Sequence, residues 1–192
     1  MPVRARVSAR LTLSDTERVR ATTVLLDLDG VLRHFDLDRV HTIEQRYGLR
    51  DGILHEVAFE PELVDQVITG RIRRTEWVQR VGERVGQVDA AIETFDDIGV
   101  VDAAMLAEVD ALRSDGATVA VLTNGTDTIR EEMEALGIDS RFDAIFNSAD
   151  LGVAKPDRRV FESVCSRLEV QPAQVLLPTT RYAVWEGRSR SA

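Results

Sequence analysis

The stretch Val24-Leu25-Leu26-Asp27-Leu28-Asp29-Gly30-Val31 decides the fold of this 192-residue chain. Its apolar start, closed by a turn signal, predicts a short buried strand. Because side chains alternate along a strand, the carboxylates of Asp27 and Asp29 should point the same way at its end, with Gly30 allowing a turn behind them. Two carboxylates there are costly unless a cation or a reaction requires them, and ligands bind at this end of open α/β sheets. The alternative is a solvated Asp-Gly turn that merely ends the strand.

A single lysine stands out in the composition. Of the 24 basic residues, all are arginine except Lys155, which lies in Gly152-Val153-Ala154-Lys155-Pro156-Asp157. Arginine presents a planar fork, whereas lysine is a compact charge on a flexible stem, so the two are not interchangeable at a phosphate. A lysine spared by a strong arginine bias indicates a functional position; the alternative is chance survival of a surface lysine.

A second polar strand end follows at Thr118-Val119-Ala120-Val121-Leu122-Thr123-Asn124-Gly125. The apolar run predicts a strand, and Thr126 begins a helical pattern that stops at Gly137. Hydroxyl, amide and free backbone N–H groups at a junction of strand and helix can hold an anion. The same residues could also serve only as the N-cap of the helix.

Together these three stretches resemble the haloacid dehalogenase (HAD) superfamily. Its first motif, Asp-x-Asp-Gly-Val/Thr, is matched by residues 27–31. Its second, a strand ending in Thr/Ser and often followed by Asn-Gly, is matched by 123–125, and its third, a lysine often in Lys-Pro-Asp, by 155–157. The resemblance covers residues 22 to about 177. It implies an α/β fold, a Rossmann-like HAD core with a parallel sheet, plus an inserted small helical cap.

The resemblance also implies roles for the matched residues. Asp27 would be the nucleophile that forms an aspartyl-phosphate, and Asp29 the general acid and then the general base. Thr123 and the backbone near Asn124 would bind the phosphoryl oxygens, and Lys155 would offset negative charge on nucleophile and substrate. The family uses Mg²⁺, which Asp27, the backbone carbonyl of Asp29 and an acid of a fourth motif would hold here. Such cations are needed because a carboxylate about 4 Å from a phosphate charge is repelled by about 4 kcal/mol at an effective dielectric of about 20.

Asp29 also separates reaction classes, because dehalogenases of this superfamily lack an acid/base aspartate at that position. We therefore expect Mg²⁺-dependent hydrolysis of a small phosphorylated metabolite. Two alternatives stay open: a catalytically impaired relative that binds phosphate or a partner, and a phosphoacceptor signalling domain. The long insertion after the first strand and the Asp-x-Asp spacing argue against the signalling domain.

The fourth motif is missing where the family expects Asp-Asp or a nearby acid. The strand predicted at 174–177 is followed by Pro178-Thr179-Thr180-Arg181-Tyr182, and no carboxylate appears before Glu186. If the codons are CCG-ACG-ACG, a shifted frame contains GAC-GAC, which encodes Asp-Asp. We hypothesise that the residues from about 178 onward are a frameshifted tail. Codons without a shifted GAC-GAC would rule this out, and a true loss of the acids would remove a metal ligand.

The predicted elements place an insertion inside a core. Residues 21–35 and 100–178 form the core, and residues 36–99 form a helical cap with three apolar helical sets that end at Gly48, Gly70 and Gly86. Residues 1–20 are expected to be a flexible tail, and residues 179–192 to be irregular. Within the core a helix is expected over 104–112, and strands then alternate with helices, which predicts a parallel sheet with helices on both faces. These alternating segments are 117–123, 126–136, 143–147, 157–168 and 174–177.

A cap of this kind closes over a site and helps to choose the substrate. Its candidate contacts are polar or aromatic residues near the first motif and in the cap: His34, His41, Arg71, Arg73, Arg74 and Trp77. The alternative is that the arginines form a solvated face and that Trp77 packs inside the cap. No histidine pair has metal-ligand spacing, which argues against a zinc site.

Composition excludes several classes of protein. A net charge of −9 gives nucleic-acid binding no electrostatic support. No apolar run approaches 18 residues, so we expect no membrane span. The basic N-terminal stretch lacks the apolar region of a signal peptide, and a single cysteine excludes an intrachain disulfide, so we expect a cytoplasmic protein. That cysteine, Cys165, lies in a helical apolar pattern and is expected to fill the core.

Overall fold

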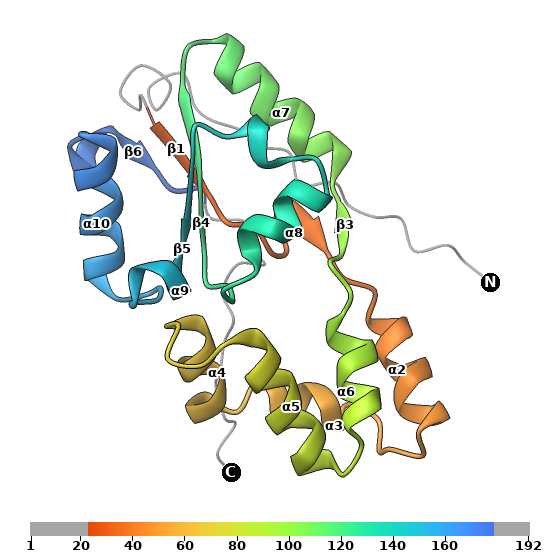
Figure 1. Ribbon diagram of the computed structural model, residues 1–192. Coiled ribbons are helices and arrows are strands. Elements are labelled where there is room, and N and C mark those ends of the chain that lie inside the picture. Colours follow the sequence, from red (N-terminus) through yellow and green to blue (C-terminus); the bar gives the residue numbers. More distant parts are fainter. Residues whose placement is uncertain (1–22, 179–192) are drawn as a thin grey trace, which may run out of the picture.

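The structure, a computed structural model, describes residues 23–178 of the chain. Figure 1 shows an α/β core on one side and a group of short helices, the cap, on the other. Within the described residues, no helix is both long and apolar enough to cross a membrane. The tails predicted at 1–20 and 179–192 lie outside the described residues. Of the segment in the frameshift hypothesis, which starts at about residue 178, only that first residue is described.

The core is built on a four-stranded parallel sheet in the order β5-β4-β1-β6. The strands are β1 (Thr23–Leu26), β4 (Thr118–Thr123), β5 (Ala144–Asn147) and β6 (Val175–Leu176). Parallel neighbours need crossover connections, and helices supply them here. Leu26 is in register with Val121, so Asp27 follows β1 at the level of Leu122 near the carboxyl end of β4. The predicted parallel sheet is confirmed.

Helices cover both faces of the sheet, as predicted, because side chains alternate along each strand. One face packs on α7 (Ala103–Ser114) and α8 (Ile129–Ala135), and the other on α10 (Arg158–Leu168). Figure 1 shows α7 and α10 on opposite sides of the sheet. The first face buries Val24, Leu26, Val119, Val121, Met105 and Met133, and the second buries Leu25, Ala120, Leu122, Phe146, Val160 and Val164. Cys165 on α10 is only partly buried.

The cap contains five helices between the first two motifs. They are α2 (Leu37–Arg46), α3 (Ile53–Ala58), α4 (Pro61–Ile68), α5 (Arg74–Val85) and α6 (Val88–Phe95). The glycines expected to end three of them, Gly48, Gly70 and Gly86, all have positive φ, which glycine adopts without strain. The sequence patterns did not predict α3, which has only six residues, or α6, which starts shortly after Gly86.

Three further details differ from the predicted elements. The two segments that join core and cap pair as a short antiparallel ribbon of β2 (Arg33–His34) and β3 (Val100–Val101). A short helix, α9 (Ser148–Leu151), follows β5. Helix α8 starts at Ile129 and not at Thr126, because the intervening loop is tied to β5 and α9: the Asn147 side chain donates to the Thr126 carbonyl, and Gly125 N–H donates to Ser148 Oγ at 3.2 Å.

Candidate active site

The lysine and the first aspartate meet at the carboxyl end of the sheet. Lys155 lies in the loop between α9 and α10, and its Nζ is 2.7 Å from Asp27 Oδ2 and donates to the Leu122 carbonyl at 2.8 Å. The other carboxylate oxygen of Asp27 accepts the Leu28 N–H at 2.9 Å. The side chains of Lys155 and Asp27 stay 22% and 28% exposed, so a ligand can reach both.

Asn124 positions the loop that carries the lysine. Its Oδ1 accepts the Lys155 N–H at 2.8 Å, and its Nδ2 donates to the Lys155 carbonyl at 2.9 Å. Both polar atoms of the side chain are therefore engaged, and a contribution of Asn124 to phosphoryl binding would come from its backbone. The neighbouring Thr123 ends β4 and is only 1% exposed. By register it lies level with Leu28, directly beside the Asp27 segment.

The second aspartate is held by a residue that the sequence analysis missed. Asp29 Oδ1 accepts from Arg33 Nε at 2.7 Å, and Arg33 Nη1 donates to Glu132 Oε2 at 2.6 Å. Burial alone would lower the pKa of Arg33, but the hydrogen bonds and charges of Asp29 and Glu132 outweigh it and raise the pKa, so Arg33 stays charged. Glu132 falls one helical turn after Ile129 on the buried face of α8, and a charge at such a position was the signal available in the sequence.

Comparison with known proteins agrees with this arrangement. A family model described as haloacid dehalogenase-like hydrolase matches residues 21–177. The chain belongs to this family. The predicted family and fold class are thereby confirmed for the HAD core and its helical cap.

Two curated relatives of the chain carry the name of haloacid dehalogenases. The chain is 30% identical over 131 residues to (S)-2-haloacid dehalogenase 4A of Burkholderia cepacia, which covers 67% of this chain and 54% of that protein. It is 33% identical over 66 residues to (S)-2-haloacid dehalogenase 1 of Pseudomonas sp. (strain CBS-3), covering 34% of this chain and 29% of that protein. The chain thus spans about half the length of the first relative and less than a third of the second.

Solved structures share the fold. A HAD family enzyme from Bacteroides thetaiotaomicron, in complex with magnesium and inorganic phosphate, is 19% identical with a TM-score of 0.67, and the match covers 82% of this chain and 83% of that one. An L-2-haloacid dehalogenase from Xanthobacter autotrophicus is 19% identical with a TM-score of 0.60, covering 82% and 69%. At these identities the likeness shows the HAD fold and not the reaction.

The donor set at the HAD site fits a magnesium ion. Mg²⁺ prefers oxygen ligands, keeps several waters, and needs only one or two carboxylates beside substrate phosphate oxygens. The partly exposed carboxylate of Asp27 and the backbone carbonyl of Asp29, both shortly after β1, would supply such oxygens. The fourth-motif acid expected from the family is absent from the sequence between residue 178 and Glu186, so the chain lacks that ligand at the expected position.

Arg74, one of the predicted contacts in the cap, reaches the core. Its backbone N–H donates to Asp127 Oδ1 at 2.7 Å, and its Nε lies 3.7 Å from Glu132 Oε1. Trp77 instead packs inside the cap, where its Nε1 donates to the Ala58 carbonyl at 3.1 Å. The other four predicted contacts lie elsewhere: Arg71 pairs with Asp65, Arg73 is exposed before α5, His34 lies beside Asp102, and His41 beside Glu44.

One cluster in the cap has the composition of a metal site. The ligand atoms of His41, Glu44 and Asp51 lie within 4.8 Å of one another. Glu44, however, is fully buried, and its two oxygens accept the N–H groups of Gly52 at 2.6 Å and Leu54 at 2.9 Å. This carboxylate therefore satisfies the free N–H groups at the start of α3, which explains its burial without a metal.

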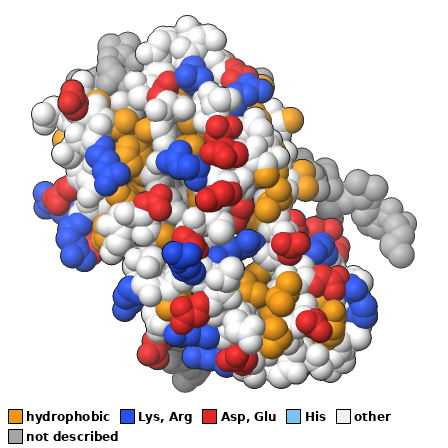
Figure 2. All heavy atoms as spheres, in the orientation of Figure 1, with side chains coloured by type: hydrophobic (Ala, Val, Ile, Leu, Met, Phe, Trp, Pro, Cys, Tyr) orange, Lys and Arg blue, Asp and Glu red, His pale blue; other side chains and the backbone are white. Residues whose placement is uncertain are grey.

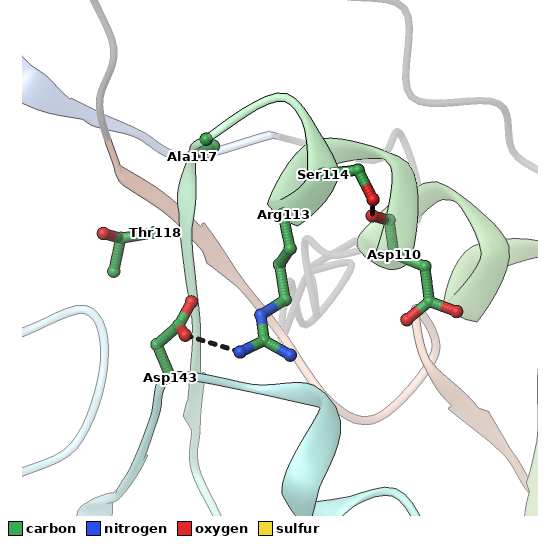
Figure 3. Close-up of a pocket in the computed structure, with 7 residues that line it drawn as sticks. Asp110, Arg113, Ser114, Ala117, Thr118 and Asp143 are labelled. Atoms are coloured by element: carbon green, nitrogen blue, oxygen red, sulfur yellow. Dashed lines mark hydrogen bonds and ion pairs between the residues drawn. The ribbon is translucent and has the colours of Figure 1, made fainter.

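A cavity of about 540 Å³ lies at the opposite end of the sheet from the aspartates. Thr118, the first residue of β4, lines it together with Arg113 of α7 and Asp143 (Figure 3). Arg113 and Asp143 form an ion pair at 2.7 Å, and Asp143 Oδ2 accepts the Val119 N–H at 2.8 Å. These contacts lower the pKa of Asp143, led by the hydrogen bond from Arg113. The charges that line this cavity already have partners, so we assign it no ligand.

Proposed function

We propose that this HAD chain hydrolyses phosphate monoesters with Mg²⁺ through an aspartyl-phosphate. The observation that carries the proposal is the second carboxylate, Asp29, two residues after Asp27 at the same strand end and 40% exposed. An alcohol leaving from phosphorus needs a proton, because an alkoxide is a poor leaving group, whereas a halide leaves as a stable anion. A second, reachable carboxylate therefore serves ester hydrolysis and has no task in carbon–halogen cleavage.

The first half-reaction transfers the phosphoryl group to the protein. A carboxylate oxygen of Asp27 forms a bond to phosphorus while the bond from phosphorus to the ester oxygen breaks. The electron pair of that bond stays on the leaving oxygen, which takes a proton from the protonated carboxyl of Asp29. The products are an alcohol, an aspartyl-phosphate at Asp27, and an ionised Asp29.

The second half-reaction returns the protein to its starting state. The ionised Asp29 takes a proton from a water molecule as the water oxygen attacks phosphorus. The bond between phosphorus and Asp27 then breaks, inorganic phosphate leaves, and Asp29 is again protonated. The same residue thus donates the proton that it later recovers.

Lys155 makes the approach of two negative groups feasible. Its ammonium already contacts Asp27 at 2.7 Å, so a phosphoryl oxygen that approaches Asp27 meets the same positive charge. Magnesium, when held by Asp27 and the backbone carbonyl of Asp29, would supply further positive charge to offset the negative charge of the phosphoryl oxygens. Thr123 and the backbone of Asn124 end the neighbouring strand and would donate to those oxygens.

A small phosphorylated metabolite remains the proposed substrate, and the cytoplasm the proposed location. A cavity of about 320 Å³ has the size of a small-molecule site, but almost all of its lining comes from the cap and none of the proposed catalytic residues lines it. Arg74, Val78 and Phe95 of the cap line it opposite Thr128 of the core. Figure 2 shows acidic and basic side chains intermixed over one face of the described residues, with no basic stripe of the kind that follows a nucleic-acid backbone.

Dehalogenation is the second candidate, because the two curated relatives carry that name. In that reaction Asp27 would attack carbon and displace a halide, and Asp29 would play no part in proton transfer. A catalytically impaired relative that binds phosphate is a third candidate, motivated by the missing fourth motif.

Two assays on the purified chain separate the candidates. We expect Mg²⁺-dependent release of p-nitrophenol from p-nitrophenyl phosphate, abolished in Asp27→Asn, and no halide release from (S)-2-chloropropionate. Halide release without phosphatase turnover would establish the dehalogenase. Phosphate binding by calorimetry with neither activity would establish the impaired relative and overturn the proposal.

A further inference from the structure

Arg33 occupies an unusual position between two carboxylates. Its side chain is 2% exposed, yet its guanidinium contacts Asp29 at 2.7 Å and Glu132 at 2.6 Å. Nη1 also donates to the Ile98 carbonyl at 3.3 Å, and Cζ lies 4.9 Å from the centre of the Phe35 ring. Arg33 is therefore fixed from helix α8 and from both segments that join the core to the cap.

Glu132 is held as firmly as the arginine it contacts. Its side chain is 9% exposed, and its Oε1 accepts from Thr128 Oγ1 at 2.6 Å while Oε2 accepts from Arg33. A carboxylate held at both oxygens fixes the plane of the guanidinium that it binds, because arginine donates through a rigid fork. The direction of Arg33 Nε toward Asp29 is thus set by Glu132.

This arrangement matters for Asp29 because that side chain is itself 40% exposed. A carboxylate so exposed would otherwise sample several rotamers. Among the hydrogen bonds of residues 23–178, those of Asp29 engage Oδ1 alone, so Oδ2 is left for a transferring proton. Geometry of this kind governs proton transfer, which is efficient only within hydrogen-bond reach of the leaving oxygen.

We propose that Arg33 and Glu132 are positioning residues that fix the Asp29 carboxyl for proton transfer to the leaving group. This inference rests on the phosphatase function proposed above. Neither residue touches the substrate; Arg33 acts by holding Oδ1, and Glu132 acts through Arg33. In the step that they serve, the bond from phosphorus to the ester oxygen breaks and its electron pair stays on that oxygen. The ester oxygen then takes the proton from Asp29 Oδ2.

Dependence on the leaving group tests the positioning role. Phenyl phosphate and p-nitrophenyl phosphate have nearly the same shape, but phenolate needs protonation far more than p-nitrophenolate does. The test variant is Arg33→Met/Glu132→Met, which removes both members of the ion pair together, although Arg74, 20% exposed, also loses Glu132 as a partner. We expect kcat/KM to fall about 100-fold for phenyl phosphate and less than about 10-fold for p-nitrophenyl phosphate.

Three comparisons keep the result interpretable. The matched control Arg46→Met/Glu93→Met removes an ion pair of 2.8 Å on the cap surface. It should leave kcat/KM unchanged for both substrates. Circular dichroism and thermal unfolding check that each variant folds. If the double variant fails to fold, Arg33→Lys keeps the charge but loses the fork, and it should show the same selective loss.

The outcomes distinguish this inference from the function on which it rests. A wild-type chain without phosphatase turnover overturns both. An active wild type whose Arg33 variants lose the same factor on both substrates, or lose nothing, overturns the positioning role alone. A selective loss for phenyl phosphate with an unchanged Arg46 control supports it.

Discussion

The core and the cap are packed by different means, and they divide the work of the protein. The core buries apolar side chains on both faces of its sheet, and Asp27, just after β1, contacts Lys155 from the loop before α10. The cap surrounds a separate cluster of its own, in which Leu63 and Trp77 are buried. The cap thus has an apolar cluster separate from those of the core, and under the function proposed above the core would carry out the reaction while the cap would govern access to it.

The two regions touch through few side chains. Gly70 of the cap lies so close to Ala149 of α9 that an added Cβ would come within 2.4 Å of the Ala149 carbonyl oxygen. Arg74 binds Asp127 and approaches Glu132 from the start of α5. Because these contacts are local, changes in the core, in the cap and at the joint should have separable effects, and their order of size tests the division of work.

The largest effect is expected in the core at the nucleophile. Asp27→Asn keeps the shape of the side chain but removes the charged oxygen, so turnover of p-nitrophenyl phosphate with Mg²⁺ should fall by about three orders of magnitude or more. Asp51→Asn, a change at an exposed cap carboxylate, is the control and should leave the rate unchanged. Equal rates for wild type and Asp27→Asn would break the assignment of chemistry to the core.

The next effect is expected at the lysine. Lys155→Met removes the ammonium that contacts both Asp27 and the Leu122 carbonyl, and kcat/KM should fall by about 100- to 1,000-fold. Lys155→Arg should recover little, because a guanidinium fork cannot occupy the place of a compact ammonium. Full activity in Lys155→Arg would show that a positive charge near Asp27 is enough.

The core was predictable from the sequence to a much greater degree than the cap. Apolar strands that end in polar residues revealed β1 and β4, and an arginine bias that spared one residue revealed Lys155 before any contact with Asp27 was known. A short apolar run closed by a turn signal is a local pattern, so a few residues are enough to predict a strand. The short helices α3 and α6 carry too few turns for a helical period to be recognised.

Contacts within the site were missed for a different reason. The contact between Arg33 and Glu132 joins residues far apart in the chain. The place of Glu132 on the apolar face of α8 indicates a buried charge, but it does not identify Arg33 as its partner. The backbone near Asn124 was expected to bind the phosphoryl group and stays a prediction; that its side chain also holds the backbone of Lys155 is a pairing that only the folded loop creates. Sequence patterns place residues on elements; they do not show which side chains share a hydrogen bond.

Cavities made in the two clusters should destabilise different parts of the molecule. Leu63→Ala in the cap and Met133→Ala in the core each remove a fully buried side chain, at a cost of about 2–5 kcal/mol. Hydrogen exchange should show faster exchange in α4 to α6 for Leu63→Ala, with protection in β1 and β4 retained. For Met133→Ala, protection should fall throughout the core. A loss of β1 protection in Leu63→Ala would show that the two clusters unfold as one unit.

A glycine at the joint offers a smaller and sharper test. Gly70 and Gly48 have nearly the same φ, +70° and +68°, but only at Gly70 does a Cβ meet a neighbour. Gly48→Ala should cost about 1–2 kcal/mol of unfolding free energy from conformation alone. Gly70→Ala should cost about 1–3 kcal/mol more, because the cap must move away from Ala149. Urea unfolding of both variants measures the difference, and equal costs would mean that Gly70 does not set the distance between cap and core.

The smallest effect is a pH dependence confined to the cap. His55 stacks on Phe59 with ring centroids 4.3 Å apart, and burial lowers its pKa below 6.5, although the charge of Glu44 partly opposes this. The folded cap therefore favours neutral His55, whereas the unfolded chain binds the proton at its ordinary pKa of about 6.5. This contribution to stability is present above about pH 6.5 and is lost as the pH falls through the lower, folded pKa.

The ring resonances of His55, followed by NMR from pH 8 to pH 5, should titrate below 6.5. His55→Gln should remove the pH dependence from hydrogen-exchange rates in the cap and leave the exchange rates of the core unchanged. A His55 midpoint at or above 6.5 would show that Glu44 outweighs burial, and the cap would then gain stability as the pH falls.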